Sequence, residues 1–332
     1  MEIIPVHPSA PEPAAIARAA NVLRGGGLVA FPTETVYGLG ANALDARAVA
    51  GIFDAKGRPA FNPLIVHVAD VRMARTLVSS WPDSADALAE RFWPGPLTLV
   101  LPRATTVPDI VTGGLDDVAV RIPAHPVALA LLRASALPIA APSANRSTEI
   151  SPTTAGHVVK SLGDRVAIIL DGGPTTVGIE STVVDLAGGR PRVLRPGMVT
   201  ARELEAVVGR LDEHAAPAGA APRAPGQLAR HYAPRARLVV CGCDEGARVL
   251  AASEARPTGA IIVTAVDWPA DHVERLPPDP AGYAARIYAA LHALDDAGCR
   301  LIVAEALPET PGWMALQDRL TRAAHAAPDP GP

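Results

Sequence analysis

The chain is poor in aromatic residues, in cysteine and in long apolar runs, and each scarcity excludes a class of protein. Aromatic residues make up only 4% of the 332 residues, so a core must be built mainly from Ala, Val, Leu and Ile. The three cysteines, at positions 241, 243 and 299, form an odd count without zinc-type spacing and are interpreted as small residues in a reducing compartment. No run approaches the roughly eighteen apolar residues of a membrane span, and the amino-terminal segment has no secretory pattern. The sequence predicts a cytoplasmic protein with no membrane partner.

Several catalytic and nucleotide-binding motifs are also missing. The chain has no G-x-x-x-x-G-K-[ST] loop and no G-x-G-x-x-G after a first strand, which excludes the common phosphate-binding loops. It has no H-E-x-x-H, no cysteine quartet and no G-x-S-x-G elbow, so a tightly held metal or a serine nucleophile is not expected. A net charge of −4 argues against a nucleic-acid coat over the whole surface but leaves a local basic cleft open.

Length and patterning predict two α/β domains. Hydrophobic residues make up 49% of the chain, enough for a sizeable core. In the first domain, residues 1–206, helix-like and strand-like segments alternate, and short turns between some strands predict a mixed sheet. The expected helices are 13–24, 45–55, 84–92, 126–134 and 153–162, and the expected strands are 27–31, 63–68, 97–101, 118–122, 138–141, 167–170, 181–186 and 192–194.

The second half of the chain begins with a linker. Residues 207–236 are rich in Pro, Gly and Ala and have no hydrophobic period, which is typical of a connecting segment of restricted flexibility. Residues 237–328 then form a smaller unit, with strands expected at 237–241, 259–264 and 300–305 and helices at 280–297 and 313–324. Its size fits a small three-layer domain.

A hydroxyl-rich run, FPTETVYGLG at residues 31–40, is the most informative segment. It follows the strand 27–31 and carries Thr33, Glu34, Thr35 and Tyr37 before two glycines. Hydroxyls packed so densely are costly to bury unless they are hydrogen-bonded. We interpret the run as a loop at the end of a strand, where α/β proteins usually bind ligands. The alternative is a polar loop with two turn glycines.

Two cations close together suggest recognition of phosphate. Lys56 and Arg58 are two residues apart, and in an extended or turn segment both can reach one side. Asn62 follows, and then a strand that carries His67. Arginine offers a bidentate fork and lysine a point charge, a combination that suits a polyphosphate. The alternative is a solvated turn followed by a hydrogen-bonded strand histidine.

Further polar residues lie at the ends of strands or inside them. Ser143 and Asn145 follow the strand 138–141 and can donate to phosphate or ribose, although an Asx or Ser turn is the alternative. Arg121 lies in an apolar strand and needs an anionic partner, either a structural carboxylate or a substrate. Ser181 begins a strand after a glycine-rich turn, and Arg195 comes just after the strand 192–194; ordinary turn chemistry is the alternative for both.

Taken in order, these motifs resemble the Sua5/YrdC/YciO family. The pairing of Lys56 and Arg58 with Ser143 and Asn145 is the most distinctive part, and the resemblance covers about residues 10–205. Residues 224–234, APGQLARHYAP, and the unit after them resemble the linker and C-terminal domain of the longer, Sua5-type members. The resemblance implies a YrdC-like mixed twisted sheet with helices around a concave basic cleft, plus a smaller Rossmann-like α/β domain. The implied domains are 1–206, 207–236 and 237–328.

The resemblance also implies a reaction. Members of this kind are L-threonylcarbamoyladenylate synthases, which join L-threonine, bicarbonate and ATP, with Mg²⁺, into threonylcarbamoyl-AMP and pyrophosphate. The product goes to a separate transferase complex that modifies adenosine 37 of tRNA, and a weak contact with tRNA is a further expectation. Such a reaction depends on positioning and on charge neutralisation, and it needs no protein nucleophile.

The site residues that the resemblance implies form two sets. In the set for L-threonine, Arg121 takes the carboxylate and the backbone of Ala141 adds a contact; the set is Thr35, His67, Arg121, Ala141 and Ser181. The set for ATP includes two cations, Lys56 and Arg58, that are also implied to be catalytic, and Asp117 contributes to it through its backbone. The whole ATP set is Lys56, Arg58, Asn62, Asp117, Ser143, Asn145, Ser151, Arg195, His231 and Tyr232. In long members the linker folds back over the active site, which would bring His231 and Tyr232 to the nucleotide. No resident metal is expected.

Three other functions remain open from the sequence. A protein of this fold could bind double-stranded RNA or tRNA without catalysis, although such a protein has no use for His67, Arg121 and Ser181 in one small polar pocket. A carbamoyl-adenylate enzyme of hydrogenase maturation shares the domain, but zinc-finger and acylphosphatase-like segments are missing from this chain. A YciO-like paralogue would lack the C-terminal domain.

Overall fold

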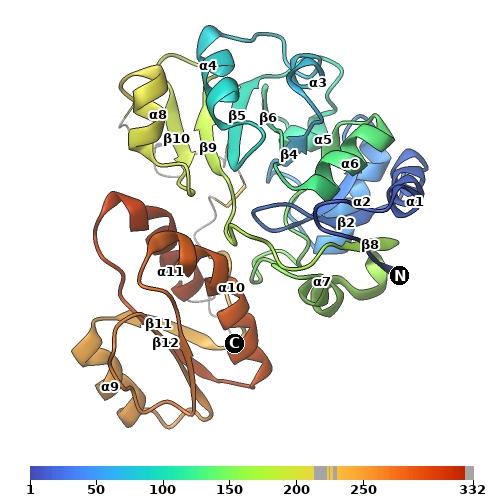
Figure 1. Cartoon of the computed structure of the whole chain (residues 1–332). Coiled ribbons are helices and arrows are strands. Elements are labelled where there is room, and N and C mark those ends of the chain that lie inside the picture. Colours follow the sequence, from blue (N-terminus) through green and yellow to red (C-terminus); the bar gives the residue numbers. More distant parts are fainter. Residues whose placement is uncertain (213–222, 224, 227–229, 326–332) are drawn as a thin grey trace, which may run out of the picture. The chain divides into compact units, whose positions relative to one another are not determined.

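The computed structural model describes residues 1–212, 223, 225–226 and 230–325 (Figure 1). The chain divides into two compact units. The first unit contains Met1–Ser147 and Pro152–Gln227, and the second contains Thr148–Ser151 and Leu228–Pro332. The predicted linker, 207–236, is therefore shared between the units, and its residues 213–222, 224 and 227–229 lie outside the described part of the chain.

The first unit is organised by a ten-stranded sheet that mixes parallel and antiparallel pairs, which confirms the predicted α/β class with a mixed sheet. Parallel pairs join β1 to β8, β8 to β2, β4 to β6 and β5 to β9, and the other neighbours are antiparallel. In spatial order the strands are β1 (Glu2–Pro5), β8 (Ile168–Asp171), β2 (Val29–Pro32), β3 (Tyr37–Asn42), β7 (Ile139–Ala140), β4 (Ile65–His67), β6 (Asp117–Arg121), β5 (Leu97–Pro102), β9 (Thr182–Asp185) and β10 (Arg192–Arg195).

Helices cover this sheet through two apolar clusters. Helices α1 and α6 lie side by side and bury one cluster against β2 and β8 (Figure 1), while α2, α4, α7 and α8 contribute to the other. The Asp45 side chain accepts from the backbone N–H of Arg47 at 2.9 Å and caps α2, a contact worth about 1 kcal/mol. The helices are α1 (Pro13–Arg24), α2 (Ala46–Lys56), α3 (Val71–Arg75), α4 (Asp83–Phe92), α5 (Asp109–Thr112), α6 (Pro126–Ser135), α7 (Ala155–Leu162), a 3₁₀ turn (Gly163–Arg165) and α8 (Ala201–Val208).

Alternation along four neighbouring strands creates a second, partly polar face. Side chains along a strand point alternately to the two faces of its sheet. One face of β4, β6, β5 and β9 carries Val66, Val120, Leu99 and Val184 into the larger apolar cluster. The opposite face, which we call the site face, carries a small apolar patch and the polar residues beside it: Ile65, Val100, Ala119 and Val183, with His67, Arg121 and Thr98.

The segment 31–40 was predicted as a loop at the end of a strand, and the structure has such a loop only at residues 33–36. Strand β2 extends to Pro32, a four-residue turn follows at 33–36, and Tyr37 begins β3, which pairs antiparallel with β2. A Cβ at Gly40 would lie 2.8 Å from both Ile139 of β7 and Phe31 of β2, so this glycine is required by close packing between β3 and its two neighbouring strands. The hydroxyls therefore lie on a tight hairpin turn and at the start of the next strand.

Lys56 was predicted in an extended or turn segment, but it is the last residue of α2. Gly57 ends the helix in the left-handed conformation with φ 59°, and the N–H of Arg58 bonds to the carbonyl of Phe53 at 3.0 Å, as is common at helix carboxyl ends. The strand β1 and the helices α3, α5 and α8 were not predicted. Two of these helices are only four or five residues long, too short to show a hydrophobic period.

The second unit is a four-stranded parallel sheet in the order β11-β14-β12-β13, with helices packed on both of its faces. Leu250 of α9 packs with Val303 on one face, and Leu294 of α10 lies against Gly259 on the other. This confirms a Rossmann-like three-layer unit. Its elements are β11 (Arg237–Cys241), α9 (Cys243–Ala252), β12 (Thr258–Ile262), β13 (His272–Arg275), α10 (Pro280–Asp296), β14 (Leu301–Glu305), a 3₁₀ turn (Pro311–Trp313) and α11 (Met314–Ala324).

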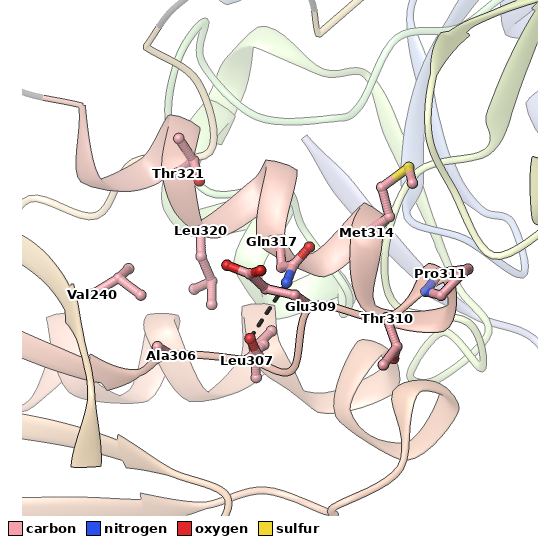
Figure 2. A pocket seen from close by; sticks show the side chains of 10 residues that line it. All are labelled: Val240, Ala306, Leu307, Glu309, Thr310, Pro311, Met314, Gln317, Leu320 and Thr321. Carbon is pink, nitrogen blue, oxygen red and sulfur yellow. Dashed lines mark hydrogen bonds between the residues drawn. The ribbon is translucent and has the colours of Figure 1, made fainter. Parts of the chain in front are cut away.

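A pocket of about 570 Å³ lies in the second unit, beyond the carboxyl end of β14 and beside α11 (Figure 2). Leu307 and Leu320 form part of its apolar lining. The side-chain amide of Gln317 donates to the carbonyls of Leu307 at 3.3 Å and Pro308 at 2.8 Å, so this polar group stabilises the pocket wall. None of the predicted site residues lines this pocket. None of the helices that the structure describes has the length and apolar character needed to cross a bilayer.

Candidate active site

The turn at 33–36 holds its hydroxyls by local hydrogen bonds. The Thr33 hydroxyl accepts from the N–H groups of Thr35 and Val36, both at 3.2 Å, and lies 2.8 Å from the Thr35 hydroxyl. Thr33 and Thr35 are almost completely buried. These bonds meet the requirement that buried hydroxyls be partnered, and they fix the Thr35 side chain in one orientation.

Arg121, at the carboxyl end of β6, is held in a buried ion pair. Its Nη2 lies 2.6 Å from Oε1 of Glu34, and the two side chains are only 4% and 8% exposed. Its Nη1 donates to the Thr35 hydroxyl at 3.1 Å and its Nε to the Gly95 carbonyl at 3.1 Å. The sequence left a structural carboxylate and a substrate as alternative partners, and the structure supplies a structural carboxylate, Glu34. Because three of the five N–H groups are used, the guanidinium is fixed while retaining donors for a ligand.

Ser181 and Arg195 form a second connected group. The Ser181 hydroxyl lies 2.8 Å from the Thr98 hydroxyl and accepts from Nη2 of Arg195 at 3.1 Å. The Nε of Arg195 donates to the backbone carbonyl of Ser181 at 3.0 Å, and Nη1 donates to the carbonyl of Pro225 at 3.0 Å. All three side chains are buried, so a second guanidinium and two hydroxyls share one small region.

Backbone contacts bring these two groups together. Gly95 accepts from Arg121, and the next residue, Pro96, accepts from the N–H of Thr182 at 3.0 Å. On the opposite side, the N–H of Gly178 bonds to the carbonyl of Thr35 at 3.1 Å, three residues before Ser181. Three residues of the predicted threonine set, Thr35, Arg121 and Ser181, therefore lie on segments that are hydrogen-bonded to one another through the backbone.

Lys56 organises the loop that carries Ser143 and Asn145. Its ammonium donates to the backbone carbonyls of both residues and lies 3.4 Å from the Asn145 side-chain oxygen. The same loop is hydrogen-bonded to β3, because the N–H of Ala144 bonds to the carbonyl of Tyr37 at 2.8 Å. A lysine that is only 2% exposed supplies a positive charge directly behind this loop, which favours an anionic ligand in front of it.

Arg58 and Asn62 form a compact turn that leads into β4. The Arg58 Nε donates to the Asn62 carbonyl at 3.2 Å, and Nη2 donates to the Pro63 carbonyl at 2.8 Å. Asn62 is 1% exposed, and neither atom of its side-chain amide has a protein partner in the described residues. A buried amide without partners costs free energy unless a ligand or water satisfies it, so Asn62 is a strong candidate for ligand contact.

His67 lies on the site face in register with Arg121 across β4 and β6. Its ring meets Phe31 edge-on at 6.3 Å, and its Nδ1 has no hydrogen-bond partner among the described residues. Burial, reinforced by the positive charge of Arg121, lowers the pKa of His67 to about 3. The imidazole is thus neutral at physiological pH and can offer a hydrogen bond to a small polar substrate. Ala141 lies nearby, because its N–H bonds to the Ile65 carbonyl at 2.9 Å.

The buried neutral state of His67 predicts a pH dependence of stability. In the unfolded chain this histidine has an ordinary pKa of about 6.5, so between that value and about 3 the unfolded state binds more protons. Neutral His67 therefore makes its full contribution to the free energy of unfolding above a pH of about 6.5. This contribution is lost as the pH falls from about 6.5 toward about 3. We expect His67→Gln to flatten this part of the profile, as measured by urea unfolding between pH 4 and 7. The matched control is His272→Gln, at an exposed histidine of β13, and an unchanged slope in His67→Gln would contradict the assignment.

Asp117 has a carboxylate that is engaged by the linker. Arg223 pairs with the carboxylates of Asp117 and Asp185, which lie at the ends of β6 and β9. This agrees with the expectation that any ligand contact at Asp117 would use its backbone. The remaining predicted ATP residues, Ser151, His231 and Tyr232, belong to the second unit.

Sequence reasoning did not assign three residues that the structure places in or beside the cluster. Glu34 was noted only as a carboxylate in the hydroxyl-rich run, although the need of Arg121 for an anionic partner was a signal for it. Thr98 is a polar residue inside the apolar strand 97–101, and a polar residue at such a position could have identified it as a candidate for the site. Arg223 lies in a segment without hydrophobic period, so no pattern pointed to it.

The cluster can bind a small zwitterion beside a polyphosphate. Arg121 and Arg195 are buried and fixed, and Lys56 supplies a third cation. Asn62 and His67 carry polar atoms that have no partner in the part of the chain that the structure describes. The described residues contain no grouping of three or more His, Cys, Asp or Glu that could hold a metal ion. Fixed cations without a nucleophile suit transfer of a phosphorus centre, where catalysis depends on positioning and electrostatics. Fold and cluster together define an α/β protein of the nucleotidyl-transfer class.

Comparison with known proteins places the chain in a family. Residues 21–197 match the Sua5_yciO_yrdC family, which is described as "Telomere recombination", and residues 199–325 match the Sua5_C family, described as "Threonylcarbamoyl-AMP synthase, C-terminal domain". The chain therefore belongs to the Sua5/YciO/YrdC family and carries the C-terminal domain of its Sua5-type members.

Relatives are similar over nearly the whole chain. The threonylcarbamoyl-AMP synthase of Pyrococcus abyssi is 45% identical over 317 residues, which cover 92% of each chain. The enzyme of the same name from Bacillus subtilis is 44% identical over 320 residues, covering 93% of this chain and 92% of the other. Among solved structures, P. abyssi Sua5 complexed with L-threonine superposes with a TM-score of 0.92 at 45% identity and covers 98% of each chain.

Proposed function

We propose that this chain is a threonylcarbamoyl-AMP synthase that joins L-threonine, bicarbonate and ATP and releases pyrophosphate. The observation that carries the proposal is the connected cluster of Thr35, Arg121, Ser181 and Arg195, with the Lys56 loop beside it. It is supported by synthases of this name that are 44–45% identical over more than nine-tenths of the chain. We assign the activity to a YrdC-like catalytic domain at 1–206, followed by a linker at 207–236 and a C-terminal domain at 237–328.

L-Threonine would be bound by the polar group on the site face. Arg121 takes the carboxylate with its remaining N–H donors, while Glu34 holds the guanidinium in place. The rest of the amino acid is then surrounded by two hydroxyls, from Thr35 and Ser181, by the neutral imidazole of His67 and by the backbone of Ala141. The P. abyssi protein solved with L-threonine supports this choice of substrate.

ATP would be bound by the cations and the polar loop beside this group. Arg58 and Arg195 contact phosphate oxygens, and Lys56 neutralises charge from behind the Ser143–Asn145 loop. The side-chain amide of Asn62 gains the partners that it lacks. Asp117, through its backbone, and Ser151, His231 and Tyr232 remain in the proposal as further ATP contacts. The amine of threonine condenses with bicarbonate and releases water to give an N-carboxylate. An oxygen of this carboxylate attacks the α-phosphorus, and the P–O bond to the leaving pyrophosphate breaks as the new P–O bond forms.

Mg²⁺ would enter with the nucleotide as its counter-ion. Three carboxylates of the first unit are held in ion pairs, because Glu34 pairs with Arg121, and Asp117 and Asp185 pair with Arg223. Magnesium usually depends on substrate phosphates for much of its coordination, and this donor set suits MgATP as the substrate. The product would pass to a tRNA threonylcarbamoyl transferase complex, with at most a weak direct contact to tRNA. We place the reaction in the cytoplasm, in keeping with three cysteines that form no disulfide.

The proposal predicts threonine-dependent release of pyrophosphate. Purified protein with ATP, Mg²⁺, bicarbonate and L-threonine is expected to release one pyrophosphate for each threonylcarbamoyl-AMP formed, as measured by a coupled phosphate assay and by mass spectrometry of the adenylate. Omission of threonine or of bicarbonate provides the matched control. Pyrophosphate release that does not depend on threonine would overturn the assignment, and no release under any of these conditions would favour the RNA-binding alternative.

A further inference from the structure

Helix α10 carries a polar stripe on a face that is otherwise part of a core. Tyr288, His292 and Asp295 are spaced four and three residues apart, so they lie on one face of the helix. All three are nearly buried. Buried polar side chains need partners, and the partners of this stripe, which we call the α10 stripe, are two segments that come from elsewhere in the sequence.

The first segment is Thr148–Ser151, which belongs to the second unit although the chain on both sides of it belongs to the first. The His292 Nε2 lies 3.2 Å from the Ser151 carbonyl. Because a carbonyl can only accept, Nε2 carries the proton and His292 is the donor. The preceding residues Ser143 and Asn145 are the ones held by Lys56, and Ser147 is bonded through its N–H to the Lys56 carbonyl at 2.8 Å.

The second segment is residues 231–236, which contains the predicted His231–Tyr232 pair. Tyr232 is stacked on Tyr288 with ring centroids 5.8 Å apart, and the Arg319 guanidinium lies 5.1 Å from its ring. Asp295 accepts from the N–H groups of Arg235 and Ala236 at 3.0–3.2 Å. One helix face thus fixes the segment at both ends.

The two segments also bond directly to each other. The N–H of Ala233 donates to the Thr148 carbonyl at 2.9 Å, and Glu149 and Ala233 form a parallel β-bridge. Three of the proposed ATP residues, Ser151, His231 and Tyr232, therefore belong to a single assembly that is held together by the α10 stripe. Tyr232 adopts φ 60°, a left-handed conformation that costs a non-glycine residue free energy and that this packing maintains.

We propose that the α10 stripe is a positioning element for the nucleotide, and that His292 is its positioning residue for Ser151. The proposal rests on the proposed function, because it concerns residues assigned there to ATP. It gives the C-terminal domain a defined task in the reaction: its helix α10 sets the backbone of 148–151 and of 231–236 in the arrangement that ATP requires. The threonine residues Thr35, Arg121 and Ser181 all lie in the first unit, so binding of threonine does not depend on the stripe.

The test compares nucleotide and amino-acid binding in His292 variants of the full chain. His292→Ala removes the hydrogen bond to Ser151, and we expect the dissociation constant for ATP, measured by calorimetry without bicarbonate, to rise about three- to ten-fold. The constant for L-threonine is expected to stay within about two-fold of the wild-type value. His292→Gln, whose amide can still donate to the carbonyl, is expected to recover most of the ATP affinity. Hydrogen exchange at the Ala233 amide is expected to be faster in His292→Ala.

The matched control is Leu250→Ala, which removes a buried side chain of α9 on the opposite side of the sheet and touches neither segment. It lowers the stability of the unit without altering the α10 stripe. Equal losses of ATP and threonine affinity in His292→Ala, no loss at all, or the same ATP loss in Leu250→Ala would each overturn the positioning role. A wild-type protein that binds no ATP would overturn the proposed function itself, which keeps the two failures distinguishable.

Discussion

Replacing Lys56 with methionine is expected to lower kcat/KM for ATP by about 1.5 to 3 orders of magnitude, which corresponds to about 2–4 kcal/mol for a lost charge-assisted contact near a reacting phosphate. The substitution keeps the length of the side chain and removes its charge. It also leaves the Ser143 and Asn145 carbonyls without the ammonium that holds them, so the loop is expected to loosen. Steady-state kinetics with varied ATP measure the effect.

The chain provides its own control for this experiment. Lys160 is the other of its two lysines and lies exposed on α7, so Lys160→Met is expected to keep wild-type kinetics. Lys56→Arg restores a positive charge but not its compact geometry and is expected to recover only part of the activity. Arg58→Ala is expected to lose a similar amount to Lys56→Met. Wild-type turnover in either Lys56→Met or Arg58→Ala would remove that residue from the mechanism.

Replacing Arg121 with alanine is expected to lower the free energy of unfolding by about 3–5 kcal/mol, because the substitution leaves the Glu34 carboxylate buried without its ion-pair partner. It is also expected to abolish saturable binding of threonine at millimolar concentration. Chemical denaturation and calorimetry measure the two effects separately. Arg121→Lys keeps the positive charge, so its free energy of unfolding is expected to be higher than that of Arg121→Ala. It lacks the planar guanidinium that binds a carboxylate through two hydrogen bonds.

A double substitution separates the structural effect from the binding effect. With Glu34→Gln and Arg121→Gln together, no isolated charge is buried, and most of the lost stability is expected to return. Threonine affinity is expected to remain low, because the double variant still lacks the guanidinium that would bind the carboxylate of threonine. Threonine binding at the wild-type level in either the double variant or Arg121→Lys would show that the carboxylate is recognised elsewhere.

The long apolar elements could be predicted from the sequence because each is specified locally. Helix 13–24 was placed to the residue, and the strands at 97–101 and 118–122 agree with β5 and β6 to within one residue. The hairpin at 31–42 was missed, because its polar residues and glycines are typical of loops as well. What makes Tyr37–Asn42 a strand is pairing with β2 and β7, and pairing between distant segments leaves no local pattern.

The sequence supplied the candidate residues of the site, but it did not predict the contacts among them. The requirement that Arg121 have an anionic partner was clear from its apolar strand, but the identity of that partner depended on folding the turn at 33–36 against β6. The hydrogen bonds from the Lys56 ammonium to the Ser143 and Asn145 carbonyls could not be predicted from the sequence, because every residue has a backbone carbonyl. The assignment of 148–151 to the second unit likewise depends on partners such as His292, which is 141 positions from Ser151 in the chain.

The order of strands in the second unit has a consequence for how the protein matures. The last strand to be synthesised, β14, lies between β11 and β12, so this sheet has a gap at its centre until residues 301–305 have left the ribosome. Domains generally fold as units during synthesis, the amino-terminal one first. The first unit can therefore fold before the residues of the second unit that bind Thr148–Ser151, such as His292, have been synthesised. If Ser151, His231 and Tyr232 bind ATP as proposed, we expect a chain that is terminated before residue 301 to keep its affinity for threonine and to bind ATP more weakly.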